Sequence, residues 1–346
     1  MENVKKFSPR RLLQIVVAIL LALVLVACLA VLGFRAYMML PVTDYYLASD
    51  REFEIPGLAE GAVPQGFCHD ERSDCFLMTG YSASGKASRL YMIDVESGEL
   101  RHSVTLLEKD GGDFTGHVGG VAVFDRYVYV AGGGESCLFV FDYQQVTTEG
   151  TASVIGEIPL SNGKDDALNA SFVFTEGDRL IVGEFHRAGD YDTLDSHKIT
   201  TQSGDKNNAL ALEFPLRADA PFGVAASATC AYSLPDQVQG MCIAEGKAYL
   251  STSWGLSFSY IYEHDMTELS DEGTITVLGE ELPLYAMDSG SLVEEYQLPP
   301  MAEEIVMLEG RLYVVGESAS SKYIFGKFTE GKWCYSTDLD QLRGED

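Results

Sequence analysis

The polar residues with the clearest chemical potential stand at the starts of five similar segments. They carry amide, imidazole, hydroxyl or carboxyl groups: Gln65, His117, Ser171, Gln239, Glu303 and Glu304. Groups of these kinds orient small ligands in concave sites, and paired carboxylates can also hold a hard cation such as Ca²⁺. Glu304 stands where three of the other segments have glycine, so it is an unusual carboxylate at a position that favours small residues.

Two histidines are candidate acids or bases in the same site. His117 precedes a Gly-Gly pair, and His186 follows an apolar run. Hydrogen bonding in turns or at a solvated rim explains the same residues, so ligand-binding and structural roles both stay open. No cofactor is predicted, and the alternative is calcium with Glu303 and Glu304 as its candidate ligands. Zinc is disfavoured because the sequence contains no C-x-x-C or H-x-x-x-H spacing.

The five segments form an internal repeat. In the best-formed copy, residues 238–253, a short apolar strand, a turn with Gly246 and a second strand follow one another. Positions 66, 120, 172, 240 and 304 are equivalent and lie roughly 50 to 70 residues apart, the spacing of a repeat fold. Each copy continues with an aromatic-rich third strand, at residues 323–327 in the last copy, and most add a fourth strand before the next copy begins.

Four strands per repeat predict an all-β chain folded as a β-propeller of five four-stranded blades. A sixth blade is the alternative if the long third or fourth unit hides one. Residues 52–56 match the fourth-strand pattern, so we expect them to complete the last blade beside or instead of residues 333–336, which closes the ring. No amphipathic helix is expected after Gly33, and the irregular insertion at 186–207 is predicted to be functional.

Six of the seven cysteines follow the N-terminal region. Cys68 and Cys75 flank a hairpin turn, whereas Cys230 and Cys242 fall on neighbouring strands across a blade junction. Each pair is a candidate disulfide in an oxidising compartment, and free buried thiols are the alternative.

The N-terminus predicts a membrane anchor. Residues 1–11 read as a basic cytoplasmic tail, 12–34 as a transmembrane signal-anchor, 35–48 as a connector, 49–342 as an extracytoplasmic propeller and 343–346 as an acidic tail. The stretch from Leu12 to Gly33 has no charged residue, and a helix of that length crosses a bilayer, with its basic flank inside. Leu25-Val26-Ala27-Cys28 resembles a bacterial lipobox, so a lipoprotein anchored at Cys28 is one alternative and ordinary signal cleavage is another.

The charge of the chain excludes one class of function. The formal net charge is −28 over 346 residues, and the first 35 residues hold five bases and a single acid, so the remainder is more acidic still. Such a surface repels phosphate backbones, which argues against nucleic-acid binding.

The starts Gln65-Gly66, Gly119-Gly120 and Gln239-Gly240, together with the N-terminal anchor, resemble bacterial secreted or membrane-anchored β-propeller proteins over roughly residues 50–340. A more distant likeness is to NHL-type and gluconolactonase propellers. The resemblance implies the fold and the location but transfers no active-site residue. Two functions follow as hypotheses: a membrane-tethered module that binds a protein, glycan or small ligand at its channel face, or a Ca²⁺-assisted hydrolase or lactonase with its site at the central channel.

Overall fold

The computed structural model describes residues 8–163 and 165–344. It divides into two units after Thr43. Lys5 and Lys6 of the predicted basic tail, and the last two residues of the predicted acidic tail, lie outside the described residues.

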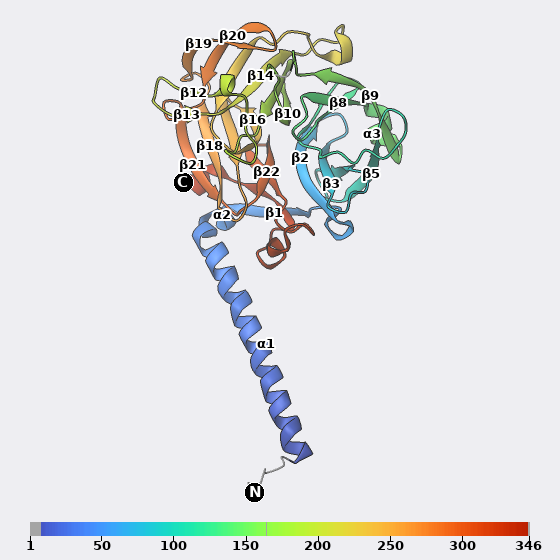
Figure 1. Cartoon of the computed structure of the whole chain (residues 1–346), viewed down its shortest axis with the longest axis vertical. Coiled ribbons are helices and arrows are strands. Elements are labelled where there is room, and N and C mark those ends of the chain that lie inside the picture. The colour runs from blue at the N-terminus through green and yellow to red at the C-terminus, as the bar shows by residue number, and fades with distance from the viewer. Residues whose placement is uncertain (1–7, 164, 345–346) are drawn as a thin grey trace. The chain divides into compact units, whose positions relative to one another are not determined.

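The first unit is one long apolar helix, α1 (Pro9–Met39), followed by a 3₁₀ turn, η1 (Leu40–Val42) (Figure 1). Ser8 caps its start, because the Ser8 Oγ accepts the Arg11 N–H at 3.4 Å. Pro9 is tolerated there, since the first N–H groups of a helix have no partner within it. Within the described residues this is the one helix long and apolar enough to cross a membrane, so it is a membrane anchor or a signal sequence.

The second unit contains five four-stranded blades, each antiparallel within itself, and parallel pairings at blade edges join some of them into larger sheets. Blade 1 comprises β2 (Ala62–Asp70), β3 (Cys75–Ser82), β4 (Arg89–Asp94) and β5 (Leu100–Leu107). Blade 2 comprises β6 (Val121–Phe124), β7 (Tyr127–Ala131), β8 (Cys137–Asp142) and β9 (Thr151–Pro159). Blade 3 comprises β10 (Ala170–Glu176), β11 (Arg179–Glu184), β14 (Ala209–Pro215) and β15 (Cys230–Leu234). Blade 4 comprises β16 (Val238–Ala244), β17 (Lys247–Thr252), β18 (Ser259–Asp265) and β21 (Leu292–Leu298).

Blade 5 is made from both ends of this unit. It comprises β22 (Ala302–Leu308), β23 (Arg311–Gly316), β24 (Trp333–Thr337) and, on its outer edge, β1 (Ser49–Glu54). The prediction that the segment ahead of the first copy completes the last blade is confirmed, and it lies beside β24 rather than in its place. The predicted third strand at residues 323–327 is wrong: this segment includes the 3₁₀ helix η5 (Ile324–Phe328), and β24 takes the third place.

The first strand of every blade contacts the first strands of the blades on both sides. The contacts run from β2 to β6, β10, β16, β22 and back to β2, which closes a ring. Figure 1 shows these strands near the middle of the β-domain, with β9 and β21 towards its outside. The fold is therefore a five-bladed β-propeller, as the repeat predicts.

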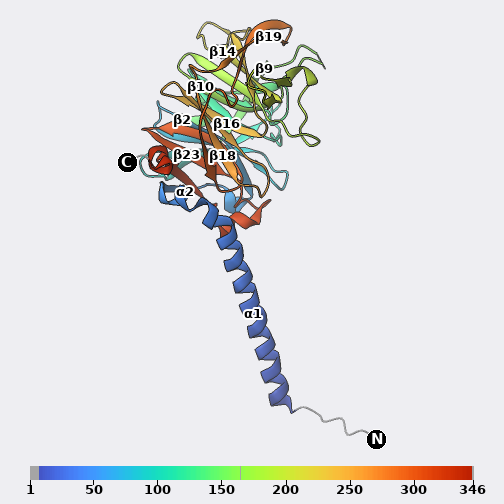
Figure 2. The same cartoon turned by 90° about the vertical axis from the view of Figure 1, so that its left-hand side faces the viewer.

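The length of the fourth unit is explained by a hairpin rather than by a sixth blade. The strands β19 (Ser270–Val277) and β20 (Glu280–Ala286) are inserted between β18 and β21. β20 pairs in parallel with β15, so the hairpin extends the outer edge of blade 3. Figure 2 places β19 at the opposite end of the β-domain from β23. A second parallel pairing, between β5 and β9, joins blades 1 and 2.

Short helices occur where none was expected after Gly33. They are α2 (Thr43–Leu47), α3 (Tyr143–Thr148) and α4 (Leu339–Arg343), together with the 3₁₀ turns η2 (Leu58–Glu60) and η4 (Pro221–Gly223). Each is too short to show a helical repeat of apolar residues, which is why the sequence pattern does not reveal it. Asp142 and Asp338 cap α3 and α4 through their side chains.

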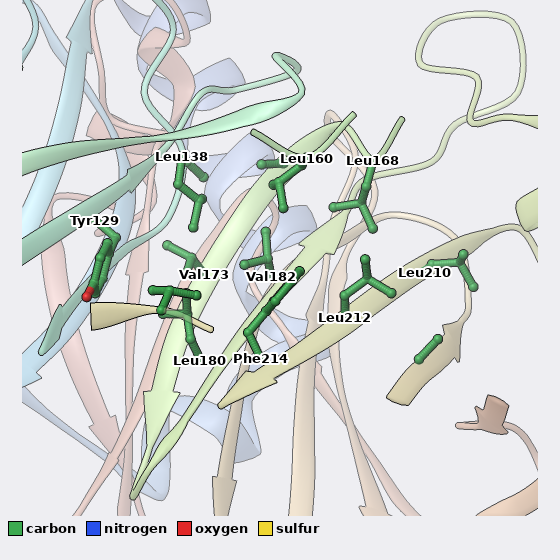
Figure 3. Close-up of a cluster of buried hydrophobic side chains, with 14 of the residues drawn as sticks. Tyr129, Leu138, Leu160, Leu168, Val173, Leu180, Val182, Leu210, Leu212 and Phe214 are labelled. Carbon is green, nitrogen blue, oxygen red and sulfur yellow. The ribbon is translucent and has the colours of Figure 1, made fainter. Parts of the chain in front are cut away.

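The core lies between neighbouring blades. Figure 3 shows one cluster, in which Tyr129 and Leu138 of blade 2 pack near Val173, Leu180 and Leu212 of blade 3, all fully buried. Comparable clusters join blade 1 to blade 2, blade 3 to blade 4 and blade 5 to blade 1. Each such side chain contributes about 1.5–3 kcal/mol on burial, so apolar packing between blades is the main source of stability.

The C-terminal helix is held to blade 4 by a buried carboxylate. Glu263 is fully buried and accepts hydrogen bonds from Lys247 Nζ at 2.5 Å, Tyr296 Oη at 2.6 Å and Arg343 at 2.6 Å. Removing one partner of a buried ion pair leaves the other charge uncompensated, so this cluster fixes α4.

Candidate functional site

Close approach of backbones at the propeller axis requires glycine. A Cβ atom on Gly120 would lie 2.8 Å from the Phe172 Cα, and one on Gly240 would lie 2.6 Å from the Glu304 Cα. Gly66 is confined in the same way by the backbones of Gly119 and Gly120. The glycines in the repeat starts are therefore explained by first strands that pack backbone against backbone.

Glu304 binds the inner strands of three other blades. Its carboxylate Oε2 accepts the Phe67 N–H of blade 1 at 3.1 Å and the Val121 N–H of blade 2 at 3.3 Å, and the Val173 N–H of blade 3 also bonds to it. With 1% exposure, the residue is buried at the axis, and its backbone packs against Gly240 of blade 4. Burial raises the pKa of Glu304 well above its ordinary value, and the three N–H donors act in the opposite direction.

A cavity of about 450 Å³ opens where the five blades meet, and every blade contributes to its wall. Blade 5 and the loop after β23 supply the charged side, and blades 3 and 4 supply an aromatic side. The wall includes Gln65, Tyr81, His117, Asn169, Ser171, Phe185, Tyr191, Asp192, Gln239, Ser253, Trp254, Met301, Glu303, Glu317, Lys322 and Tyr323, with glycines between them.

Five of the predicted site residues line this cavity together: Gln65, His117, Ser171, Gln239 and Glu303. The other two do not. Glu304 is directed at backbone N–H groups, and His186 is buried, with its Nδ1 2.8 Å from Asp236 Oδ1 and its Nε2 3.5 Å from Asp192 Oδ1. These contacts fix His186 as a support of the insertion rather than as a wall of the cavity.

Glu303 and Glu317 form a carboxyl pair in the cavity. Glu303 is only 3% exposed, and among the described residues its side chain makes no hydrogen bond or ion pair. Burial, reinforced by the charge of Glu317, raises the pKa of Glu303 well above its ordinary value. Burial also raises the pKa of Glu317 to about 7, although Lys322 and a hydrogen bond from Gln65 Nε2 at 3.4 Å oppose this effect.

Lys322 bonds to a tyrosine instead of to either carboxyl. Its Nζ lies 2.6 Å from Tyr81 Oη, 5.3 Å from the centre of the Tyr81 ring and 4.8 Å from that of Tyr323. Burial acts to lower the pKa of Lys322, but the hydrogen bonds with Tyr323 and Tyr81 raise it above its ordinary value. The ammonium therefore remains charged over the whole neutral range.

His117 packs against the same tyrosine, with 4.2 Å between the ring centres of His117 and Tyr81. Burial, followed by the charge of Lys322, lowers the pKa of His117 to about 4. The imidazole is therefore neutral at pH 7, where it can accept or donate a hydrogen bond but does not supply a positive charge.

The aromatic side of the cavity depends on the insertion that follows β11. Phe185, Tyr191 and Trp254 contact one another with ring centres 5.6–6.1 Å apart, and Arg187 lies 4.2 Å from the centre of the Trp254 ring. The predicted insertion at 186–207 contains η3 (Asp195–His197) and the small hairpin of β12 (Ile199–Thr200) and β13 (Lys206–Asn207).

A buried pair beneath the insertion holds it in place. His197 Nδ1 lies 2.9 Å from Glu184 Oε2, and both side chains are 1% exposed. Glu184 also accepts the N–H groups of Leu210 at 3.2 Å and Asn169 at 3.3 Å. Tyr191 and Asp192 are thereby presented to the cavity by a fixed loop.

Comparison with known families and with characterised proteins gives no match for this sequence. Solved structures with β-propeller folds are similar to it. Myxococcus xanthus glutaminyl cyclase is 13% identical, with a TM-score of 0.43 over 84% of this chain and 94% of its own. Aldose sugar dehydrogenase from Streptomyces coelicolor, in its PQQ-bound form, is 13% identical, with a TM-score of 0.40 over 77% and 76% of the two chains. BamB from Moraxella catarrhalis is 8% identical, with a TM-score of 0.32 over 74% and 80%. We assign the fold from the sheet topology and the closed ring of first strands, not from these likenesses.

The candidate calcium ligands do not form a cation site. Glu304 Oε2 accepts N–H groups, which compete with a cation for that oxygen, and Glu303 faces the cavity instead. No group of three or more His, Cys, Asp or Glu side chains in the described part of the chain converges for a metal ion. Ca²⁺ takes six to eight oxygen ligands, so the residues present do not fit it.

All seven cysteines are free thiols, so neither predicted disulfide is present. Cys68 pairs with Leu77 across the first hairpin, which places Cys75 at the diagonal position. Diagonal neighbours lie about 7–8 Å apart, which is beyond the usual reach of a disulfide. Cys230 is on the outermost of the blade's own strands in blade 3, whereas Cys242 is on the innermost strand of blade 4.

Sequence reasoning missed several residues of the cavity. Tyr81, Phe185, Trp254 and Glu317 occur at or just after the end of a second strand, in four different copies of the repeat. In a hairpin the end of the second strand lies beside the start of the first, so this position faces the same site and could have been found from the repeat.

We predict that Glu304→Ala lowers the free energy of unfolding by more than about 3 kcal/mol, because each of three buried N–H groups then lacks an acceptor at a cost of about 1–3 kcal/mol. The Glu304→Gln variant keeps an acceptor oxygen at the same place, so its free energy of unfolding should fall by less. Urea unfolding followed by tryptophan fluorescence measures both variants. Equal stability of the alanine and glutamine variants would contradict the role given to these hydrogen bonds.

A second prediction concerns pH. The pKa of Glu317 is raised from 4.5 to about 7 in the folded chain, so its protonated form contributes stability below pH 4.5 that is lost as the pH rises through 7. The melting temperature of the wild type, measured relative to that of Glu317→Gln, should therefore fall between pH 5 and pH 8, a range that follows from this shift. Glu96→Gln, at an exposed turn, is the matched control and should show no such change. A difference that stays constant with pH would refute the assignment.

Proposed function

We propose that this chain is a membrane-tethered extracytoplasmic β-propeller that binds a small ligand in the cavity where its five blades meet. The observation that carries the proposal is the state of Glu303: a carboxyl group that is 97% buried lines an open cavity and has no hydrogen-bonding partner among the described residues. Because Glu303 lines the cavity, a ligand there would supply the hydrogen-bonding partner that the described residues do not.

The size and lining of the cavity support a small ligand over a protein or a glycan chain. Its volume of about 450 Å³ falls in the range of about 300–1,000 Å³ that is typical of small-molecule sites. Aromatic side chains form much of the wall, and a few polar groups converge on the interior, which is the usual composition of such sites. A protein partner would need a patch of roughly 800 Å² per side, of which this cavity is only a small part.

The proposed location rests on α1 and its flanks. A helix of this length and hydropathy crosses a bilayer, and the basic residues that precede it favour the cytoplasmic side, which places the propeller outside. Cleavage of the propeller by added protease in intact cells tests this orientation. Protection that persists in spheroplasts, whose inner membrane is intact, and ends only when that membrane is permeabilised would place the domain in the cytoplasm.

No observation favours the hydrolase. The described residues hold no group of three or more His, Cys, Asp or Glu side chains that converges for a metal ion, and His117 is only weakly basic. The cavity therefore supports recognition better than metal-assisted catalysis.

Ligand binding is tested through Trp254, which lines the cavity. The chain has two tryptophans, so Trp333→Phe leaves Trp254 as the single tryptophan reporter. We expect the emission of this variant to change saturably with compounds that enter the cavity, tested as collections of cationic, neutral and anionic metabolites. Ser171→Phe, which fills the cavity from its wall, should weaken any such binding by at least about tenfold. A response that survives Ser171→Phe unchanged would place the ligand elsewhere and overturn the proposal.

A further inference from the structure

The carboxyls of Glu303 and Glu317 lack a direct countercharge. Lys322 lines the same cavity as the two carboxyls, but its ammonium donates a hydrogen bond to Tyr81 Oη and makes no ion pair within the described residues. The third carboxyl, Asp192, is already within 4.0 Å of Lys198 and 3.5 Å of His186. The cavity therefore holds two acids that make no ion pair and on which Lys322 acts only from a distance, beside open volume.

The tyrosines next to this pair form a surface that attracts cations. The ring faces of Tyr81 and Tyr323 already hold the Lys322 ammonium, and on the aromatic side the Arg187 guanidinium lies over Trp254. An ammonium over such a face gains about 0.5–2 kcal/mol, and more when water is excluded. Two separate parts of the wall thus bind positive groups of the chain itself.

We propose that the ligand is a small organic cation, with an ammonium group beside Glu303 and Glu317 and its carbon skeleton against the aromatic side of the cavity. This inference rests on the proposed function and specifies its ligand class. An ammonium donates the hydrogen bonds that Glu303 lacks, and it supplies a positive charge in direct contact, which Lys322 does not. A neutral or anionic ligand of the same shape would place no positive charge beside either carboxyl.

Binding of such a cation should be linked to protons. In the free protein burial favours the protonated carboxyls, whereas a cation beside them favours the ionised form, so binding near neutral pH releases protons. The other titratable groups that face the pair from surrounding elements are Glu304 on β22, Tyr81 on β3, His117 before β6, Asp192 in the insertion, and Lys322 and Tyr323 after β23. Of these, His117 is neutral and the two tyrosines are protonated near pH 7, so the carboxyl pair is the source of the protons.

The experiment compares three probes of matched length on the full-length protein in detergent, by calorimetry at about 150 mM salt so that the acidic surface is screened. The probes are 1,4-diaminobutane, 1,4-butanediol and succinate. We expect the diamine to bind at least about tenfold more tightly than either of the others. Titrations in two buffers of different ionisation enthalpy should show protons released with the diamine, and its affinity should rise from pH 6 to pH 8, a window set by the pKa of Glu317.

Four variants assign the binding to this pair. Glu303→Gln and Glu317→Gln should each lower the affinity for the diamine by at least about tenfold. If Glu303→Gln does not fold, Glu317→Gln alone tests the role of the pair. Glu96→Gln makes the same chemical change at an exposed turn outside the cavity and should have no effect. Lys322→Met removes a positive charge from the cavity wall, so it should raise the affinity for a cation and lower the affinity for an anion.

The outcomes separate this inference from the proposed function. Tighter binding of the diol or succinate, a diamine affinity unaffected by both glutamine variants, or no diamine binding at millimolar concentration would overturn the cation inference. The proposed function survives each of these results if the Trp254 reporter still responds to another ligand in a manner that Ser171→Phe abolishes. It fails if no class of ligand produces that response.

Discussion

The inner strands of the propeller converge so closely at the axis that their backbones cannot pair with one another in the usual way. The first strands β2, β16 and β22 have a shift of register at Gly66, Gly240 and Glu304, whereas β6 begins directly after Gly120. Glycine makes the approach sterically possible, and the carboxylate of Glu304 accepts the N–H groups that the shifts leave over. Because the Phe67 N–H and the Glu304 carboxylate lie 237 residues apart in sequence, this arrangement exists only when all blades are in place.

The two adjacent glutamates divide their functions through strand geometry. Glu303 and Glu304 lie at the register shift of β22, and their surroundings differ: the Glu304 carboxylate accepts N–H groups at the axis, while Glu303 lines the cavity. Both are buried, but the first has donors and the second has none among the described residues. One strand thus carries the residue that binds the blades together and the residue that makes the cavity a candidate site.

The repeat predicted the number of blades and the closure by the N-terminal strand, because both follow from the period and from alternation along strands. It also identified five residues of the cavity wall, since the starts of the first strands face one axis. Lys322 and Tyr323 could not be predicted as residues of the cavity wall. The aromatic and β-branched residues at 323–327 indicate a third strand, whereas η5 forms there instead. The Cys68–Cys75 disulfide is absent because of the strand register: Cys68 pairs with Leu77 and Cys75 pairs with Asp70, so the two cysteines are two positions apart in the hairpin. The sequence placed His186 in the site because it could not show its partner: Asp236 lies 50 residues further along the chain, between β15 and β16.

The pairing of β1 with β24 has a consequence for biosynthesis. Ser49 and Thr337, whose hydroxyls lie 2.8 Å apart, are 288 residues distant along the chain. At about 5–20 residues per second the first strand is made roughly 15 to 60 s before its partner. Closing a loop of this length costs about 5 kcal/mol in chain entropy. For that interval β1 has an unpaired edge, and β23 has one for the few seconds between its own synthesis and that of β24; such edges are open to strand addition by other chains. Products that end before β24 therefore cannot close the ring, and both β1 and β23 would keep an unpaired edge in them.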